Sequence, residues 1–335
     1  MIYITHSYTL DFTLGTSSYC FLDIETTGLS KIHDTIVCIG IAFHKEGYYQ
    51  SCHWIIESPE EEFVLIQSVL NQLLSFEKIY TYGGKHFELP FLLQKAKHYY
   101  LEPSPLTKVH LVDLKSSKRA RNILEQDIGF KRNLNTPGRD LAKLCKLNLT
   151  SPNSAYQTLI IEHNKEELVS LITIYHFHQF LNQLNHATLL DYYFEENTLT
   201  FYLTPSTLYP HSFQYEQGHY RGLYDHSLNR FSLSINALLL KLRTYLPPRD
   251  YYIVEGQLMH KSLAKLLPAS MRTKATKSTC YLEQETLYLP LKLANQSLYW
   301  EDEQKQIYTP YNKEVLLPFI NEILKSGIKK LAQKP

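Results

Sequence analysis

The feature that most constrains the fold of this 335-residue chain is a short apolar strand that carries two carboxylates. Residues 19–22 and Ile24 are strand formers, and Asp23 lies between them. Glu25 lies two positions after Asp23. Because side chains alternate across a strand, we expect Asp23 and Glu25 on the same face. Neighbouring carboxylates repel each other, and burial further opposes their ionisation.

A hard divalent cation such as Mg²⁺ or Mn²⁺ would offset this cost, since such ions prefer carboxylate oxygens. Thr26, Thr27 and Gly28 then turn the chain with small and flexible residues. The alternative is a strand end with two solvated acids, which is the usual meaning of an isolated Asp-x-Glu. The apolar strand before the pair and the Thr-Thr-Gly turn after it favour a metal site.

Composition describes an ordinary globular chain for which two domains are expected, with 44% hydrophobic and 20% charged residues. The net charge of +1 does not by itself indicate a nucleic-acid partner, although it leaves room for a local basic patch. Five scattered cysteines without a Cys-x-x-Cys argue against a zinc ribbon, an iron–sulfur cluster or a disulfide framework. They fit a reducing compartment.

The amino terminus lacks the basic and then apolar pattern of a signal peptide. Every apolar run is shorter than the roughly 20 residues that span a bilayer. We therefore expect a cytoplasmic protein that does not contact a membrane.

The order of predicted elements indicates an α/β domain over residues 1–188 and a β-rich α+β domain over residues 189–335. Residues 2–14 form a strand or hairpin arm, and strands over 20–25, 35–43 and 47–55 form a meander. Helices are expected from Ser58 and Pro59, from about residue 87, over 137–144 and over 162–184, with strands over 78–82 and 109–112. Short alternating segments follow from residue 191.

Two further stretches carry acids at the start of helices. Glu88 follows a strand and the Gly83-Gly84 turn. His163 and Glu167 are four residues apart and therefore share one helix face. Each stretch taken alone is compatible with an ordinary acidic first turn, and His163 alone with a surface or capping residue.

Together the three stretches resemble the DEDD superfamily of 3′–5′ exonucleases, in particular a bacterial RNase H-like branch. The resemblance covers about residues 18–180 and implies an RNase H-like mixed sheet flanked by helices. Asp23, Glu25, Thr26, Thr27 and Gly28 match the first motif in full. Tyr82, Gly84, Phe87 and Pro90 match the second motif, and His163, Asn164 and Leu171 match the third.

The chain departs from this family at two of its four acids. Glu88 and Glu167 stand where the family has aspartates, and Gly83 stands where it usually has Asn. Glutamate keeps the charge but adds a methylene, which can shift an ion or its water. Because all four carboxylates survive, an active enzyme is favoured, and an impaired nuclease is the alternative.

The resemblance implies hydrolysis of phosphodiester bonds at single-stranded or frayed 3′ ends of DNA or RNA with two Mg²⁺ or Mn²⁺ ions. It assigns Asp23 as the bridge between both ions, Glu25 and Glu167 to the first, and Glu88 to the second. His163 would act as general base or orient the water. Nucleic-acid contacts are expected from Thr26, Thr27, Gly28, Lys85, Phe87 and Asn164.

Alternative functions remain open at this stage. An RNase H-like nucleic-acid-binding protein with weak or absent catalysis is the second interpretation, and a small-molecule phosphoesterase is a less favoured third. Two basic stretches are either solvated faces or contacts to a nucleic-acid backbone. They comprise Lys115, Lys118, Arg119, Arg121, Lys131 and Arg132, and then Lys261, Lys265, Arg272, Lys274 and Lys277. Asp113 is expected to cap a helix, and the sequence names no protein partner.

Overall fold

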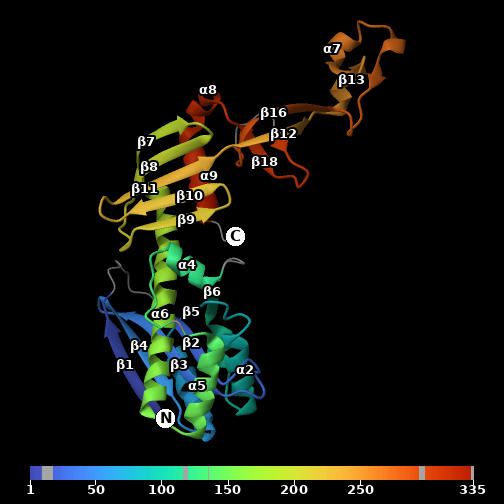
Figure 1. Cartoon of the computed structure of the whole chain (residues 1–335). Coiled ribbons are helices and arrows are strands. Elements are labelled where there is room, and N and C mark those ends of the chain that lie inside the picture. Colours follow the sequence, from blue (N-terminus) through green and yellow to red (C-terminus); the bar gives the residue numbers. More distant parts are fainter. Residues whose placement is uncertain (10–17, 116–119, 135, 294–298, 333–335) are drawn as a thin grey trace. The chain divides into compact units, whose positions relative to one another are not determined.

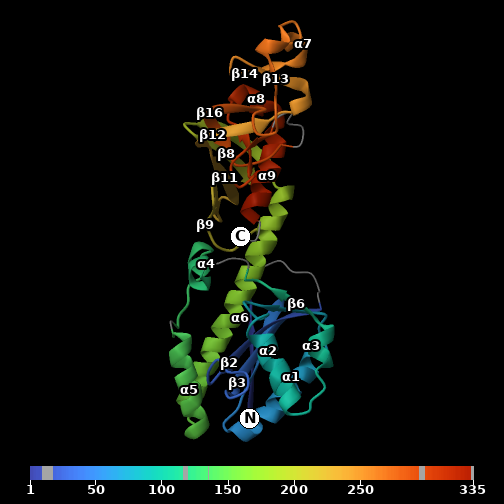
Figure 2. The same ribbon diagram turned by 90° about the vertical axis from the view of Figure 1, so that its right-hand side faces the viewer.

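The computed structural model describes residues 1–9, 18–115, 120–134, 136–293 and 299–332. Lys118, Arg119 and part of the predicted arm over 2–14 lie outside these ranges. The chain divides into two compact units, the first holding residues 1–180 and 207–213 and the second residues 181–206 and 214–332. The predicted domain boundary near residue 188 stays a prediction. Figures 1 and 2 show the elements of both units.

A six-stranded mixed sheet organises the first unit, in the order β1-β4-β3-β2-β5-β6. Its strands are β1 (Ile2–Tyr8), β2 (Tyr19–Thr26), β3 (Ile36–Lys45), β4 (Tyr48–Ile55), β5 (Lys78–Thr81) and β6 (His110–Asp113). The first four pair antiparallel, which confirms the predicted meander, whereas β5 and β6 continue the sheet in parallel from β2. All eight residues of β2 are buried, so the paired acids lie in the middle of the sheet.

Helices lie on both sides of this sheet, with α1, α2 and α3 on one side and α6 on the other (Figure 2). Their bounds are α1 (Glu62–Leu73), α2 (Glu88–His98), α3 (Ser104–Lys108), α4 (Arg121–Asp127), α5 (Gly138–Thr150) and α6 (Ser154–Gln183). Cys20, Leu22 and Ile24 of β2 belong to the main apolar core. Phe21 contacts Tyr175 of α6. The alternation of β2 therefore directs Asp23 and Glu25 toward the α6 side.

The second unit is rich in strands, as predicted. A five-stranded sheet runs β7-β8-β11-β10-β9, beside a closed barrel of β12, β16, β18 and β17 and a three-stranded sheet β14-β13-β15. The bounds are β7 (Thr188–Glu195), β8 (Thr198–Thr204), β9 (Phe213–Gln217), β10 (Tyr220–Asp225), β11 (Arg230–Asn236), β12 (Leu238–Tyr245), β13 (Tyr251–Val254), β14 (Gln257–His260), β15 (Thr273–Lys274), β16 (Tyr281–Leu289), β17 (Trp300–Glu301) and β18 (Ile307–Pro310). The described part of this unit also contains the helices α7 (Lys261–Ala264), α8 (Lys313–Leu316) and α9 (Ile320–Ala332). None of the helices within the described residues has the length and apolar character to cross a membrane.

Two predicted caps differ from the structure. Within the described residues, the first helix after Asp113 is α4, which begins at Arg121, eight positions further on. Asp113 instead ends β6 beside the turn that follows β5, and its carboxylate accepts hydrogen bonds from the backbone N–H groups of Gly83 at 2.7 Å and Lys115 at 2.9 Å. Ser58 precedes a 3₁₀ turn rather than α1, and its side chain makes no capping hydrogen bond.

Candidate active site

Asp23 is held in place by a side chain from the far end of the first unit's sequence. It is only 8% exposed, and its Oδ2 accepts a hydrogen bond of 2.9 Å from Nδ2 of Asn164 on α6. The same amide donates at 3.3 Å to the Asp23 carbonyl. Asn164 thus fixes both the strand and the carboxylate, and it is fully buried rather than open to a nucleic acid.

A chain of buried polar groups supports this contact from behind. Oδ1 of Asn164 lies 2.8 Å from Nδ1 of His53, and Nε2 of His53 lies 2.9 Å from Oγ of Ser51. Since the Asn164 amide nitrogen donates to Asp23, its oxygen accepts from His53, which is therefore protonated on Nδ1 and accepts from Ser51. Burial lowers the pKa of His53 to about 4, so the ring is neutral near pH 7.

Gly40 makes room for Asn164. A Cβ at position 40 would lie 2.0 Å from Oδ1 of Asn164 and 2.8 Å from Cδ1 of Leu168. Gly40 also pairs directly with Asp23 in the sheet. A glycine inside an apolar strand marks a close approach, so the local signal for this position is present in the sequence, whereas no local signal identifies Asn164 as its partner.

Glu88 enters the site from the start of α2 and is 5% exposed. The preceding turn is tight, because a Cβ at Gly84 would lie 2.3 Å from Oγ1 of Thr81. Burial raises the pKa of Glu88 to about 7, although its own backbone N–H and the charge of Arg121 oppose the rise. Its Oε2 is buried and has no hydrogen-bond partner within the described part of the chain.

The four predicted carboxylates are close enough to influence one another. Burial raises the pKa of Asp23 well above its usual value, and the charges of Glu167 and Glu88 raise it further. Burial also raises the pKa of Glu25 well above its usual value, and the charges of Asp23 and Glu167 add to this effect. Oε1 of Glu25 is buried and lacks a hydrogen-bond partner among the residues that the structure describes. Simultaneous ionisation of these carboxylates is therefore costly unless a cation compensates their charge.

His163 lies between two of these acids. Its Nε2 is 3.5 Å from Oε1 of Glu167 and 4.0 Å from Oε1 of Glu25. Burial lowers its pKa, against the opposing charge of Glu167. Its Nδ1 is buried without a hydrogen-bond partner in the described ranges. The predicted neighbourhood of His163 and Glu167 is present, and it includes Glu25.

Glu167 is in a different situation, because two arginines hold its carboxylate. Arg121 pairs with Oε2 and Arg132 with Oε1. Burial alone would raise the pKa of Glu167, but the charge of Arg121 and the hydrogen bond from Arg132 outweigh it and bring the pKa to about 2. Of the first basic stretch, Arg121 and Arg132 are thus neither a solvated face nor free for a nucleic-acid backbone.

The donor chemistry fits a hard cation at three of the four acids. Asp23, Glu25 and Glu88 are buried carboxylates, and two of them carry the unpaired oxygens noted above. Glu167 does not fit, because guanidinium groups occupy both of its oxygens. In the conformation described, no three His, Cys, Asp or Glu side chains among residues 1–9, 18–115, 120–134, 136–293 and 299–332 are already arranged to hold a metal ion.

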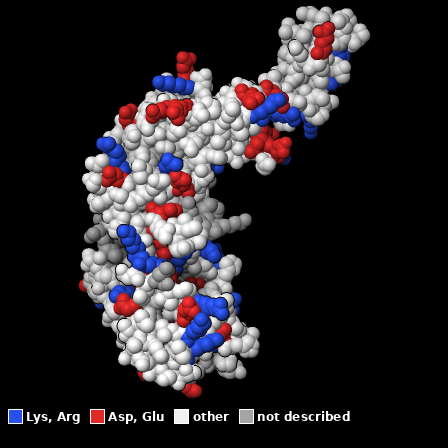
Figure 3. Space-filling model, in the orientation of Figure 1, with Lys and Arg blue, Asp and Glu red and all other residues white. Residues whose placement is uncertain are grey.

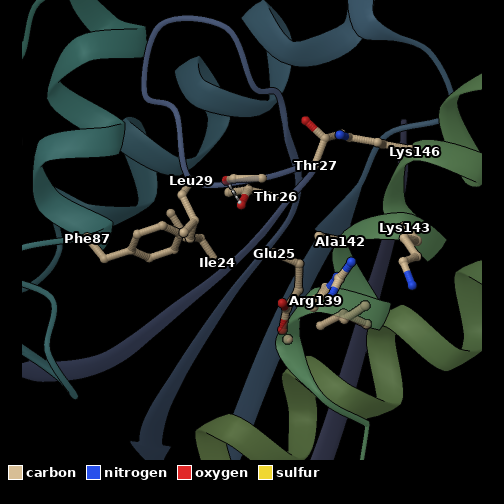
Figure 4. Close-up of a pocket in the computed structure, with 13 residues that line it drawn as sticks. Ile24, Glu25, Thr26, Thr27, Leu29, Phe87, Arg139, Ala142, Lys143 and Lys146 are labelled. Carbon is tan, nitrogen blue, oxygen red and sulfur yellow. Dashed lines mark hydrogen bonds between the residues drawn. The ribbon is translucent and has the colours of Figure 1, made fainter.

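A pocket of about 560 Å³ opens beside Glu25. Ile24, Leu29 and Phe87 lie together on one side of it, and Arg139 and Lys143 of α5 lie on the other (Figure 4). Leu29 is 82% exposed, so its side chain is accessible to a molecule that enters the pocket. The lining also includes Thr26, Thr27, Gly28 and Lys146, whereas Lys85 is exposed and is not part of it.

Basic residues gather locally at this pocket without dominating the surface. On the face that Figure 3 shows, Lys and Arg are interspersed with Asp and Glu. Arg139, Lys143 and Lys146 are spaced along one face of α5, and all three are exposed. A helical row of basic residues is usually a solvated face, so the spacing of these three residues does not by itself predict a binding site.

Residues 20–179 match the family model described as the RNase_H superfamily. The fold prediction is thereby confirmed: an RNase H-like mixed sheet flanked by helices, followed by a β-rich region. No curated protein matches the sequence.

Similarity to solved structures is low. The zinc-bound complex of E. coli exonuclease I with single-stranded DNA is 11% identical, with 56% of this chain and 54% of that chain covered and a TM-score of 0.28. The family B DNA polymerase of the hyperthermophilic archaeon Pyrobaculum calidifontis is 10% identical, with 94% and 64% covered and a TM-score of 0.43. The matches thus span less than two thirds of either protein, and TM-scores this low support no conclusion about this chain.

Proposed function

We propose that this chain is a metal-dependent 3′–5′ exonuclease that acts on single-stranded or frayed DNA or RNA. The observation that carries the proposal is the group of three buried carboxylates, Asp23, Glu25 and Glu88. Glu25 and Glu88 each carry a buried oxygen without a hydrogen-bond partner among the described residues, and Glu25 lines an open pocket. A buried group of like charges costs folding free energy, and such groups are found most often at functional sites. The match of residues 20–179 to the RNase_H superfamily model supports a nuclease, and the three motifs support the 3′ direction.

Asp23, Glu25 and Glu88 would hold the divalent cation, Mg²⁺ or Mn²⁺. When bound, such a cation neutralises charge on a phosphodiester and lowers the pKa of a coordinated water. Asn164 keeps the Asp23 carboxylate in one orientation through the bond of 2.9 Å, and His53 keeps Asn164 in place. These two residues position the site without touching the substrate.

His163 would accept the proton of the attacking water. Its ring is neutral near pH 7, because burial lowers its pKa, and Nδ1 is not used by any hydrogen bond in the described structure. A neutral imidazole with an unused nitrogen is a suitable general base. The position of Nε2 between Glu167 and Glu25 would orient the ring.

The pocket would hold the terminal nucleotide. The apolar side formed by Ile24, Leu29 and Phe87 suits the flat face of a base. The basic side from α5 suits a phosphate. In the second unit, Lys261 pairs with Asp250 and Arg272 lies over Tyr252, whereas Lys265, Lys274 and Lys277 are exposed. A contact of these three lysines with nucleic acid stays a prediction, as do the cytoplasmic location and the role of the second unit.

The test is cleavage of a single-stranded oligonucleotide labelled at its 5′ end. With Mg²⁺ or Mn²⁺ we expect a ladder that shortens one nucleotide at a time, and no shortening with EDTA or in Asp23→Ala. Asp23→Asn is the matched variant, because it removes the charge but keeps an acceptor for Asn164. It should also abolish the shortening, which would separate loss of the charge from loss of the hydrogen bond. A purified protein that leaves the labelled oligonucleotide intact with both metals would refute the proposal.

A second candidate function is nucleic-acid binding with weak or absent catalysis. The observation that favours it is the pairing of Glu167 with Arg121 and Arg132, which removes one of the four predicted metal ligands. This candidate predicts that the protein binds the oligonucleotide but does not shorten it. The two assays together separate the candidates.

A further inference from the structure

Arg121 and Arg132 form a closed network with two glutamates and a serine. Arg132 donates to both oxygens of Glu125, at 2.7 Å from Nε and 2.6 Å from Nη2. Nε of Arg121 donates to Oε1 of Glu125 at 3.1 Å and to Oγ of Ser170 at 3.2 Å. Ser170 in turn donates to Glu125, which is only 2% exposed. Bidentate contacts of this kind fix the guanidinium planes.

The network ends on Glu167. Besides the two ion pairs to its carboxylate, Arg121 donates from Nη2 to the Glu167 carbonyl at 2.7 Å. The guanidinium of Arg121 also lies over the Tyr82 ring, 5.0 Å from its centre. The arginines are therefore held by α4, α6 and the turn after β5, and they are not loose side chains that happen to reach an acid.

The charges within this network balance. Arg121 and Arg132 carry two positive charges, and Glu125 and Glu167 carry two negative charges. Of the four carboxylates that the motifs name, Asp23, Glu25 and Glu88 form no ion pair with a lysine or arginine among the described residues, whereas Glu167 pairs with both arginines. Three carboxylates suit a single divalent cation, whereas a second cation would need Glu167 and would stand against two fixed guanidinium groups.

We propose that Arg121 and Arg132 take the place of one of the two cations that the motifs imply, so that this chain binds a single divalent cation at Asp23, Glu25 and Glu88. The longer side chain of a glutamate at position 167 suits this arrangement, because its carboxylate lies between both guanidinium groups. The inference rests on the proposed function only in its use of a cation at Asp23, Glu25 and Glu88.

The test is the number of Mn²⁺ ions bound per chain, measured with the full-length protein from the electron paramagnetic resonance signal of free Mn²⁺ during a titration. We expect one ion per chain, lost in Asp23→Asn. Two ions in the wild-type protein would overturn the inference and leave the proposed nuclease function intact. The absence of any bound ion would overturn both, so the two failures are distinguishable.

Removal of the arginine charges provides the second measurement. In Arg121→Gln combined with Arg132→Gln, Glu125 and Glu167 lose their partners, and we expect the number of bound Mn²⁺ ions to rise from one to two. Lys131→Gln is the matched control, because it removes an exposed charge next to Arg132, and it should stay at one. A folded double variant that still binds one ion would overturn the inference, and the wild-type titration decides it if the double variant does not fold.

Discussion

Asn164 donates a hydrogen bond from Nδ2 to Oδ2 of Asp23 at 2.9 Å, although 141 residues separate the two in the sequence. The contact joins the first motif on β2 directly to the third motif on α6. Because Asn164 also accepts from His53, the orientation of the Asp23 carboxylate depends on residues that the motifs do not contain.

Gly40→Ala should destabilise the protein by about 1–3 kcal/mol, as overpacking of a tight core does. The new Cβ would lie 2.0 Å from Oδ1 of Asn164, and Asn164 cannot move without breaking its bond to Asp23. Chemical denaturation measures the change. Gly138→Ala is the control, because nothing lies within 4 Å of a Cβ at that position. Equal stability of the two variants would contradict the assigned role of Gly40.

His53 should make stability depend on pH. Its pKa is about 4 in the folded state and 6.5 in the unfolded state, so the unfolded chain binds more protons between these values. The contribution of the neutral His53 ring to the free energy of unfolding is complete above pH 6.5. It is lost as the pH falls toward 4, and the total loss is about 3 kcal/mol. We would measure the free energy of unfolding of the wild type and of His53→Leu from pH 4 to 7. The difference between them separates the contribution of His53 from that of the acids. His33→Leu at an exposed position is the control, and a difference that is flat with pH would refute the prediction.

Glu88→Gln should stabilise the metal-free protein at pH 8 while it abolishes metal-dependent cleavage. Burial raises the pKa of Glu88 from 4.5 to about 7, so the folded state binds more protons than the unfolded state between these values. The ionised carboxylate therefore costs up to about 3 kcal/mol above pH 7, and this cost disappears as the pH falls below 4.5. Thermal unfolding in EDTA at pH 8 and pH 4.5 measures the gain, which should be present only at the higher pH. A variant less stable than wild type at pH 8 would show that the charge is already compensated.

Lys143→Ala combined with Lys146→Ala should weaken binding of a single-stranded oligonucleotide, because both side chains line the pocket and are exposed. If both contact phosphates, the slope of log affinity against log salt should fall by about 1.4, or roughly 0.7 per contact. Fluorescence anisotropy in EDTA measures binding without cleavage. Lys97→Ala combined with Lys108→Ala removes the same charge from exposed positions outside the pocket. The prediction fails if both pairs change the slope equally.

The sequence determined the local elements and the chemistry at their ends. Alternation in β2 and a run of apolar residues predicted a buried strand with Asp23 and Glu25 on one face, and the structure contains it. The glycine turn before Glu88 and the helical spacing of His163 and Glu167 were equally local signals, because they depend on residues a few positions apart.

Only the tertiary structure decided what each acid contacts. The pairing of Glu167 with Arg121 and Arg132 joins α4, a turn and α6, and no spacing rule connects residues 35 or more positions apart. Likewise, the burial of Asn164 against Gly40 and His53 follows from how α6 packs on the sheet. Spacing along the chain fixes which residue types meet on one element. Their partners, burial and charge state depend on the neighbours that packing brings from elsewhere.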